Sequence, residues 1–114
     1  MKLVNKMDHQ RSIDLALVAG DRQLPFLSGK DRGRDARASF HFDDLDRDND
    51  VVVIVAPDFL KSVSSSFTLG LLSSSLNSLG DRFWSKYRFS GKQSVIEQMT
   101  KALRRSLAGP PTIQ

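Results

Sequence analysis

The sequence contains no cysteine among its 114 residues. This absence excludes a disulfide framework, a zinc site with thiolate ligands and a cysteine nucleophile, and it fits a reducing compartment. No apolar run approaches the roughly 20 residues that a membrane-spanning helix needs. The first ten residues, MKLVNKMDHQ, also lack the apolar stretch of a secretion signal. We therefore expect a cytoplasmic protein.

The sequence also lacks the patterns that mark catalysis or metal binding. Its two histidines, His9 and His41, have no second ligand at helical or hairpin spacing. Five aspartates lie between residues 43 and 50, but the calcium-loop glycine and closing glutamate are absent. GKDRGRDAR is neither a P-loop nor a dinucleotide fingerprint. We predict no catalytic residues, no metal and no cofactor, and hence a protein that is not an enzyme.

Three segments predict strands. VVVIVA, at 51–56, has β-branched residues in a continuous run, which is typical of a central strand buried on both faces. Residues 12–19 and 82–90 alternate apolar and polar side chains with period two, the pattern of half-exposed strands.

Three further segments predict helices. Residues 31–45 place Ala36, Phe40 and Leu45 near one helical face. Residues 65–79 carry leucines at steps of three and four, and Gly80 follows as a C-terminal cap. SVIE, at 94–97, predicts a capping box that opens a helix with Ile96, Met99, Leu103 and Leu107 on one face.

The elements alternate between strand and helix, which predicts a small layered α/β domain with parallel neighbouring strands. We expect one domain over residues 1–114, with its core at about 12–108 and flexible ends.

The segment after the apolar strand resembles a known family. APDFLKSVSSSFT, at 56–68, is similar to the phosphorylation motif of STAS domains, the anti-sigma factor antagonists, and Ser65 falls on the phosphorylated serine. Ser64 stands where that family has aspartate, and Phe67 where it has glycine. The STAS-like branch is closer, since GRDAR at 33–37 and Ser66-Phe67 resemble two of its segments.

This resemblance implies a mixed sheet with helices mainly on one side. It also implies a regulatory module that binds a protein partner, either an ATPase-type kinase or an anti-sigma-like protein, by partner switching. The implied surface is the loop and helix start at 58–67, with four candidate binding or phosphoacceptor residues: Asp58, Ser64, Ser65 and Ser66. A simpler interpretation is that Ser64 or Ser65 is only a helix N-cap.

The charge distribution leaves two alternatives open. The net charge is +4, and a basic segment spans residues 82–105 with one acid, Glu97. Its bases are Arg82, Lys86, Arg88, Lys92, Lys101, Arg104 and Arg105. They could contact nucleic acid, with Trp84 or Tyr87 stacking on bases, or they could form an ordinary solvated face. A third functional alternative, which does not rest on charge, is a small phage or mobile-element inhibitor that binds a host complex.

Overall fold

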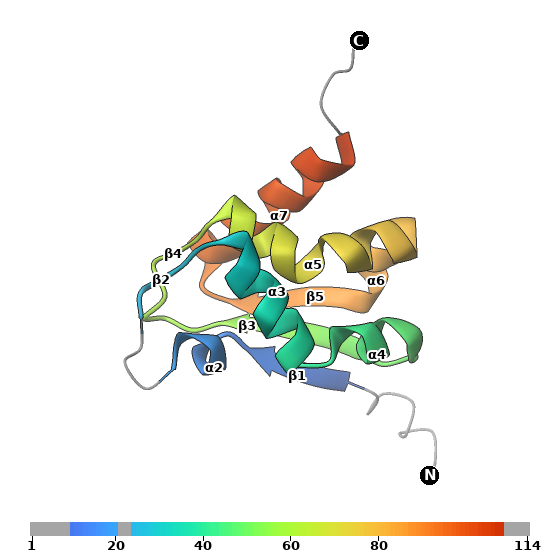
Figure 1. The fold of residues 1–114 in the computed structure, drawn as a ribbon, viewed down its shortest axis with the longest axis horizontal. Coiled ribbons are helices and arrows are strands. Elements are labelled where there is room, and N and C mark those ends of the chain that lie inside the picture. Colours follow the sequence, from blue (N-terminus) through green and yellow to red (C-terminus); the bar gives the residue numbers. More distant parts are fainter. Residues whose placement is uncertain (1–9, 21–23, 109–114) are drawn as a thin grey trace.

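The computed structural model describes residues 10–20 and 24–108, which fold around a three-stranded parallel sheet (Figure 1). The strands β1 (Gln10–Asp14), β3 (Val51–Ala56) and β5 (Tyr87–Gly91) lie in the order β1-β3-β5. Both strand pairs are parallel, and the run at 51–56 is the central strand. The predicted α/β fold is confirmed, and its sheet is parallel in the part of the chain that the structure describes.

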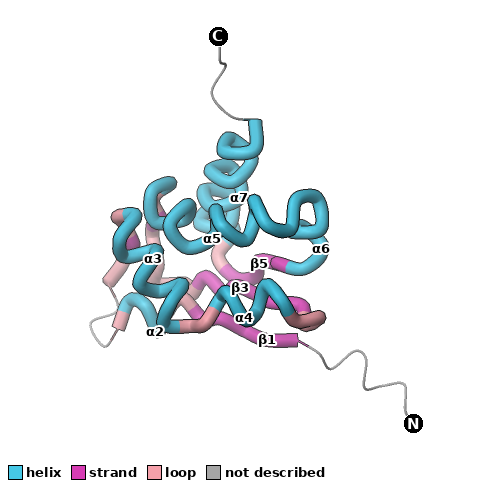
Figure 2. Tube along the Cα trace, turned by 45° about the vertical axis from the view of Figure 1, so that its right-hand side comes forward, coloured by secondary structure: helices cyan, strands magenta, loops and turns pink. Residues whose placement is uncertain are grey.

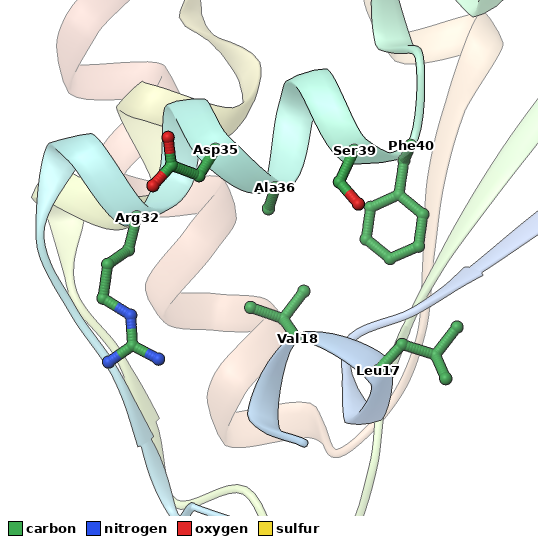
Figure 3. Close-up of a pocket in the computed structure, with 7 residues that line it drawn as sticks. All are labelled: Leu17, Val18, Arg32, Asp35, Ala36, Ser39 and Phe40. Atoms are coloured by element: carbon green, nitrogen blue, oxygen red, sulfur yellow. The ribbon is translucent and has the colours of Figure 1, made fainter.

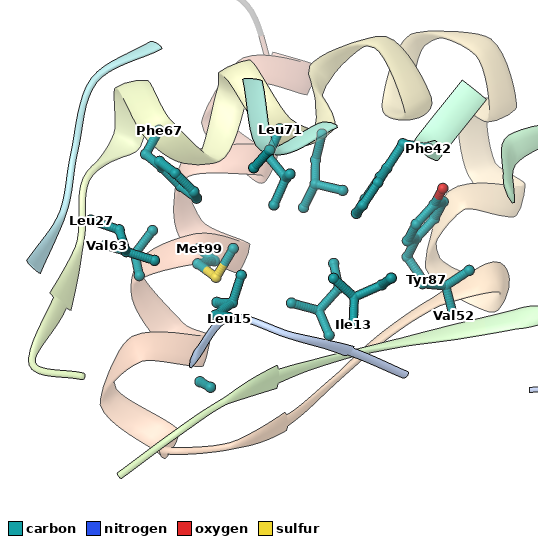
Figure 4. Close-up of a cluster of buried hydrophobic side chains, with 14 of the residues drawn as sticks. Ile13, Leu15, Leu27, Phe42, Val52, Val63, Phe67, Leu71, Tyr87 and Met99 are labelled. Atoms are coloured by element: carbon teal, nitrogen blue, oxygen red, sulfur yellow. The ribbon is translucent and has the colours of Figure 1, made fainter. Parts of the chain in front are cut away.

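The helices cover one face of this sheet (Figures 2 and 4). They are α3 (Lys30–Ser39), α4 (Phe42–Arg47), α5 (Ser65–Leu79) and α7 (Gln93–Ala108). The core lies between helices and strands, where Ile13 and Ile54 of the sheet join Phe67 and Leu71 of α5 and Met99 of α7. A second, two-stranded parallel sheet pairs β2 (Phe26–Leu27) with β4 (Ser62–Val63).

The prediction that β3 is buried on both faces is wrong. Val52, Ile54 and Ala56 are buried, whereas Val51, Val53 and Val55 are only half-buried. The alternate burial arises because the helices pack against one face only.

The first strand is shorter than predicted. It ends at Asp14, whose Oδ1 accepts a hydrogen bond of 2.9 Å from the amide of Ala16. This contact begins the short helix α2 (Ala16–Ala19), which occupies the second half of the predicted strand. In a strand, Leu15 and Leu17 would lie on the same face. Instead, Leu15 is fully buried and Leu17 is 70% exposed, so their spacing does not mark a strand.

The helix predicted at 31–45 is two helices. His41 lies between α3 and α4 with φ of 57°, in the left-handed region that interrupts a helix. The turn redirects the chain so that Phe42 and Leu45 are buried in the core.

The strand predicted at 82–90 begins only at Tyr87. A 3-10 turn, η1 (Gly80–Arg82), and the short helix α6 (Phe83–Lys86) precede it. Phe83 and Tyr87 are four residues apart, so they share a face in a helical turn as well as in a strand. Their rings are stacked at 5.0 Å between centroids.

The helix at 65–79 has the bounds that we predicted, but the last helix differs in its start and its face. α7 begins at Gln93, and the Lys92 carbonyl accepts from the amides of Val95 and Ile96, so Ser94 lies within the first turn and is not the cap. The buried face consists of Val95, Met99, Ala102 and Leu103, whereas Leu107 is 52% exposed.

The flexible ends were predicted at 1–10 and 109–114. Residues 1–9, which include His9, and 109–114 lie outside the described residues, whereas Gln10 is the first residue of β1. Among the helices that the structure describes, none is both long and apolar enough to span a membrane.

Candidate functional site

The three serines at the start of α5 have different roles: one hydroxyl is structural and two are exposed. The Ser64 side chain accepts a hydrogen bond of 3.0 Å from the amide of Phe67, which makes Ser64 the N-cap. Ser65 and Ser66 occupy the first turn and are exposed. The helix therefore relies on Ser64, and the next two hydroxyls face solvent.

Backbone pairing fixes the position of this helix start. The Ser64 amide donates to the Leu27 carbonyl at 2.9 Å, which extends the pairing of β4 with β2. The Val63 amide donates to Oε1 of Gln98 in α7 at 2.8 Å. Leu60 and Val63 are buried, so apolar side chains anchor the segment between β3 and α5, while Ser65 and Ser66 at the start of α5 remain exposed.

α3 and α5 cross in close contact near this site. A Cβ added at Gly33 would lie 2.3 Å from the Phe67 carbonyl oxygen, and one added at Gly70 would lie 2.2 Å from that of Lys30. Only glycine allows the two backbones to approach this closely. The crossing also joins the two segments that carry the family resemblance, because Gly33 of GRDAR contacts Phe67 of Ser66-Phe67.

Asp58 is exposed in the turn after β3. Its backbone carbonyl accepts a hydrogen bond of 3.1 Å from Nζ of Lys92, which follows β5. Asp58 is thus fixed to the end of the central sheet, whereas Ser64 is fixed to the smaller sheet through its amide.

The seven predicted bases do not form one surface. Lys86 is almost buried and binds Asp48 Oδ1 at 3.1 Å and the Asp50 carbonyl at 2.7 Å. Lys92 bonds Asp58, and Arg82 and Arg88 are exposed elsewhere on the chain. Lys101, Arg104 and Arg105 are exposed together near the end of α7, with Glu97 on the same surface. The Arg104 guanidinium lies 5.2 Å from the centre of the Trp84 ring.

The aspartates at 43–50 are ion-pair partners. Asp44 pairs with Arg47, Asp48 with Lys86, and Asp50 with Arg11 at 3.0 Å. Burial acts to raise the pKa of Asp48, but hydrogen bonds from the Asp50 amide and from Lys86 outweigh it and lower that pKa below its usual value. No cluster of potential metal ligands occurs within residues 10–20 and 24–108.

A buried polar cluster connects four elements, and sequence analysis did not predict it. Asp46 Oδ1 accepts from the Tyr87 hydroxyl at 2.5 Å and from the Ser75 hydroxyl at 2.7 Å, while Oδ2 pairs with Arg37 at 2.8 Å. Arg37 also donates to the Leu71 carbonyl at 3.0 Å. The cluster ties α3, α4, α5 and β5 together.

Burial, reinforced by the bond to Asp46, raises the pKa of Tyr87 well above its usual value. The hydroxyl therefore remains protonated and acts as a donor. The visible signals in the sequence were the polar residues Arg37, Asp46 and Ser75 within helical segments that also carry apolar faces.

A groove of about 440 Å³ lies between α2 and α3 (Figure 3). Leu17, Val18, Ala36 and Phe40 form its apolar lining, and Arg32 lies toward one end. None of the predicted site residues lines this groove.

Comparison of the chain with protein-family models, with curated proteins and with solved structures gives no significant match.

Proposed function

We propose that this protein is a non-enzymatic interaction module that binds a protein partner through residues 58–67 and is regulated by phosphorylation of Ser65. The observation that carries the proposal is the exposure of Ser65 in the first turn of α5, next to a cap that Ser64 alone supplies. The partner class, an ATPase-type kinase or an anti-sigma-like protein, follows from the resemblance to STAS-like domains.

The physical basis of the switch is the charge of a phosphate at a helix start. Phosphorylation adds about −1.5 to −2 charges. The unpaired amides and the positive end of the helix dipole would stabilise this charge within the protein. The phosphate would repel an acidic partner surface, and it would lose its hydration against an apolar one. The phosphorylated protein would therefore dissociate from its partner.

Two measurements test the proposal. Mass spectrometry of the Ser64–Ser66 peptide from native cells should show a phosphorylated fraction. Affinity capture should then identify a protein that wild type retains and Ser65→Asp loses. Ser74→Asp is the matched control, because Ser74 is exposed on the same helix but lies away from its start.

Two results would contradict the proposal. One is a peptide that stays unmodified in cells containing an active ATPase-type kinase. The other is a set of captured proteins that is the same for wild type, Ser65→Asp and Ser74→Asp.

A second candidate function is nucleic-acid binding. The observation that favours it is the exposure of Lys101, Arg104 and Arg105 on one helix end, beside a half-buried tryptophan. Bases in such a cluster bind phosphates, and an aromatic ring adjoining them can stack on a nucleobase.

A further inference from the structure

The face of the central sheet opposite the helices presents a row of valines. Val51, Val53 and Val55 point away from the core side of β3 and are half-buried. In the part of the chain that the structure describes, they neither belong to the hydrophobic core nor pack against it. The core side chains of Figure 4 lie between the strands and the helices, on the other side of the sheet.

An open face is unusual for this type of sheet. Parallel sheets occur almost only where both faces are covered, and their strands are apolar throughout for that reason. All six residues of β3 are apolar, as expected for a strand that is covered on both sides. The sequence and the structure agree only if another surface packs on the three valines.

Opposite charges flank the valine row. By the strand register, Ser12 of β1 and Arg88 of β5 lie on either side of Val53, and Asp14 of β1 lies beside Val55. Asp14 uses Oδ1 to accept from the Ala16 amide, and Arg88 uses Nε to donate to the Ser85 carbonyl at 3.2 Å. Each side chain keeps further atoms for hydrogen bonds, so the face has an acidic edge and a basic edge.

We propose that this face binds a second copy of the chain, sheet against sheet, about a two-fold axis that runs parallel to β3. This symmetry places β1 of each copy opposite β5 of the other, so the acidic edge meets the basic edge twice. Asp14 and Arg88 are offset by two residues along the strands, about 6.6 Å, a distance that an arginine side chain can span. The valine rows then meet at the centre of the interface.

The small area of the face determines the expected affinity. Three strands about 4.8 Å apart and about 17 Å long form a patch at or below the smallest class of specific interfaces. We therefore expect a weak dimer, with a Kd between roughly 10 µM and 1 mM.

Sedimentation equilibrium of the full chain, from micromolar to millimolar concentration, tests the proposal. The average mass should rise from 12.7 kDa toward twice that value. Val53→Lys should remove the association, and Val53→Thr, which keeps the β-branched shape, should weaken it about tenfold. Arg88→Glu, which places a carboxylate opposite Asp14, should weaken it at least fivefold at low salt.

Leu17→Lys is the matched control, because Leu17 is exposed but lines the groove toward α3. Circular dichroism shows whether each variant is folded. If Val53→Lys does not fold, Val53→Thr still tests the role of the valine row in association. A chain that stays monomeric at 1 mM overturns the proposal and leaves the face to a different partner or to chain outside the described residues. Association that Val53→Thr leaves unchanged, or that Leu17→Lys weakens equally, also overturns it.

Discussion

The Tyr87 hydroxyl is buried and donates to Asp46 in the polar cluster. Replacing Tyr87 by phenylalanine removes this donor and keeps the ring that stacks on Phe83 and Phe42. We expect Tyr87→Phe to lower the free energy of unfolding by about 1–2 kcal/mol at neutral pH, because a buried carboxylate loses one of its partners. Chemical denaturation of both proteins measures this difference.

The same residue predicts a pH dependence. The pKa of Tyr87 is raised in the folded state, so its contribution to stability is fully present below the unfolded value of about 10. It is then lost as the pH rises toward the folded pKa, at up to about 1.4 kcal/mol per pH unit. Tyr87 is the only tyrosine, so tyrosinate absorbance reports this group alone.

Tyr87→Phe is also the control for this measurement, because it lacks the phenol hydroxyl and keeps every other titratable group of the protein. The alkaline loss of stability should be steeper in wild type than in the variant. Tyrosinate absorbance that appears near pH 10 in folded wild type would contradict the prediction.

The serines at the start of α5 should differ in their contribution to stability. Ser64→Ala removes the N-cap bond to the Phe67 amide and should cost about 1 kcal/mol. Ser65→Ala and Ser66→Ala should change the free energy of unfolding by less than about 0.5 kcal/mol, because both side chains are exposed. Equal losses for all three variants would show that Ser65 has a structural role, and would weaken the proposed switch.

At the scale of the elements, the crossing of α3 and α5 depends on two glycines. Alanine normally favours a helix over glycine by about 1 kcal/mol. At Gly33 and Gly70, however, the added methyl group would meet backbone atoms, which cannot rotate away. We expect Gly33→Ala and Gly70→Ala each to destabilise the protein by about 1–3 kcal/mol.

Thermal denaturation measures this effect, and Ser74→Ala, on the exposed side of α5, serves as the control. The control should be neutral or slightly stabilising. A stabilising effect of Gly33→Ala would mean that the helices are farther apart than the structure places them.

The elements that sequence analysis predicted well are those on which independent signals agree. For α5, the leucine spacing, a serine cap and Gly80 define the same helix. The predicted start of β5, at residue 82, was wrong because the spacing of Phe83 and Tyr87 fits both a strand and a helical turn. The break between α3 and α4 depends on a left-handed His41. Histidine adopts this conformation more often than most residues, but still too rarely for its presence alone to predict a break.

The candidate site was predictable only in part. The cap and the exposed hydroxyls follow from local sequence, because capping depends on residues three apart. The cluster of Arg37, Asp46, Ser75 and Tyr87 joins residues up to 50 positions apart, and such contacts depend on the packing of whole elements. The inward position of Lys86, which bonds Asp48 and Asp50, could not be predicted for the same reason.

At the scale of the whole molecule, the net charge of +4 does not by itself decide between the two candidate functions. A basic surface attracts nucleic acid at low salt whether or not binding is its role. The two functions differ in how much nucleic-acid binding survives at physiological salt. Each phosphate contact adds about 0.7–0.9 to the slope with which the logarithm of the affinity falls against the logarithm of the salt concentration.

A salt titration with single-stranded DNA, followed by the fluorescence of the only tryptophan, distinguishes them. Because the cluster on α7 has three bases and the acid Glu97 beside them, we expect DNA binding at low salt that is lost by about 0.15 M salt. A triple variant with Lys101→Gln, Arg104→Gln and Arg105→Gln should lose DNA binding at a lower salt concentration than wild type. A control with Lys30, Arg32 and Arg34 replaced by glutamine removes the same charge from α3. Binding that persists at 0.15 M, and that only the α7 variant abolishes, would favour nucleic-acid binding over the partner-switching proposal.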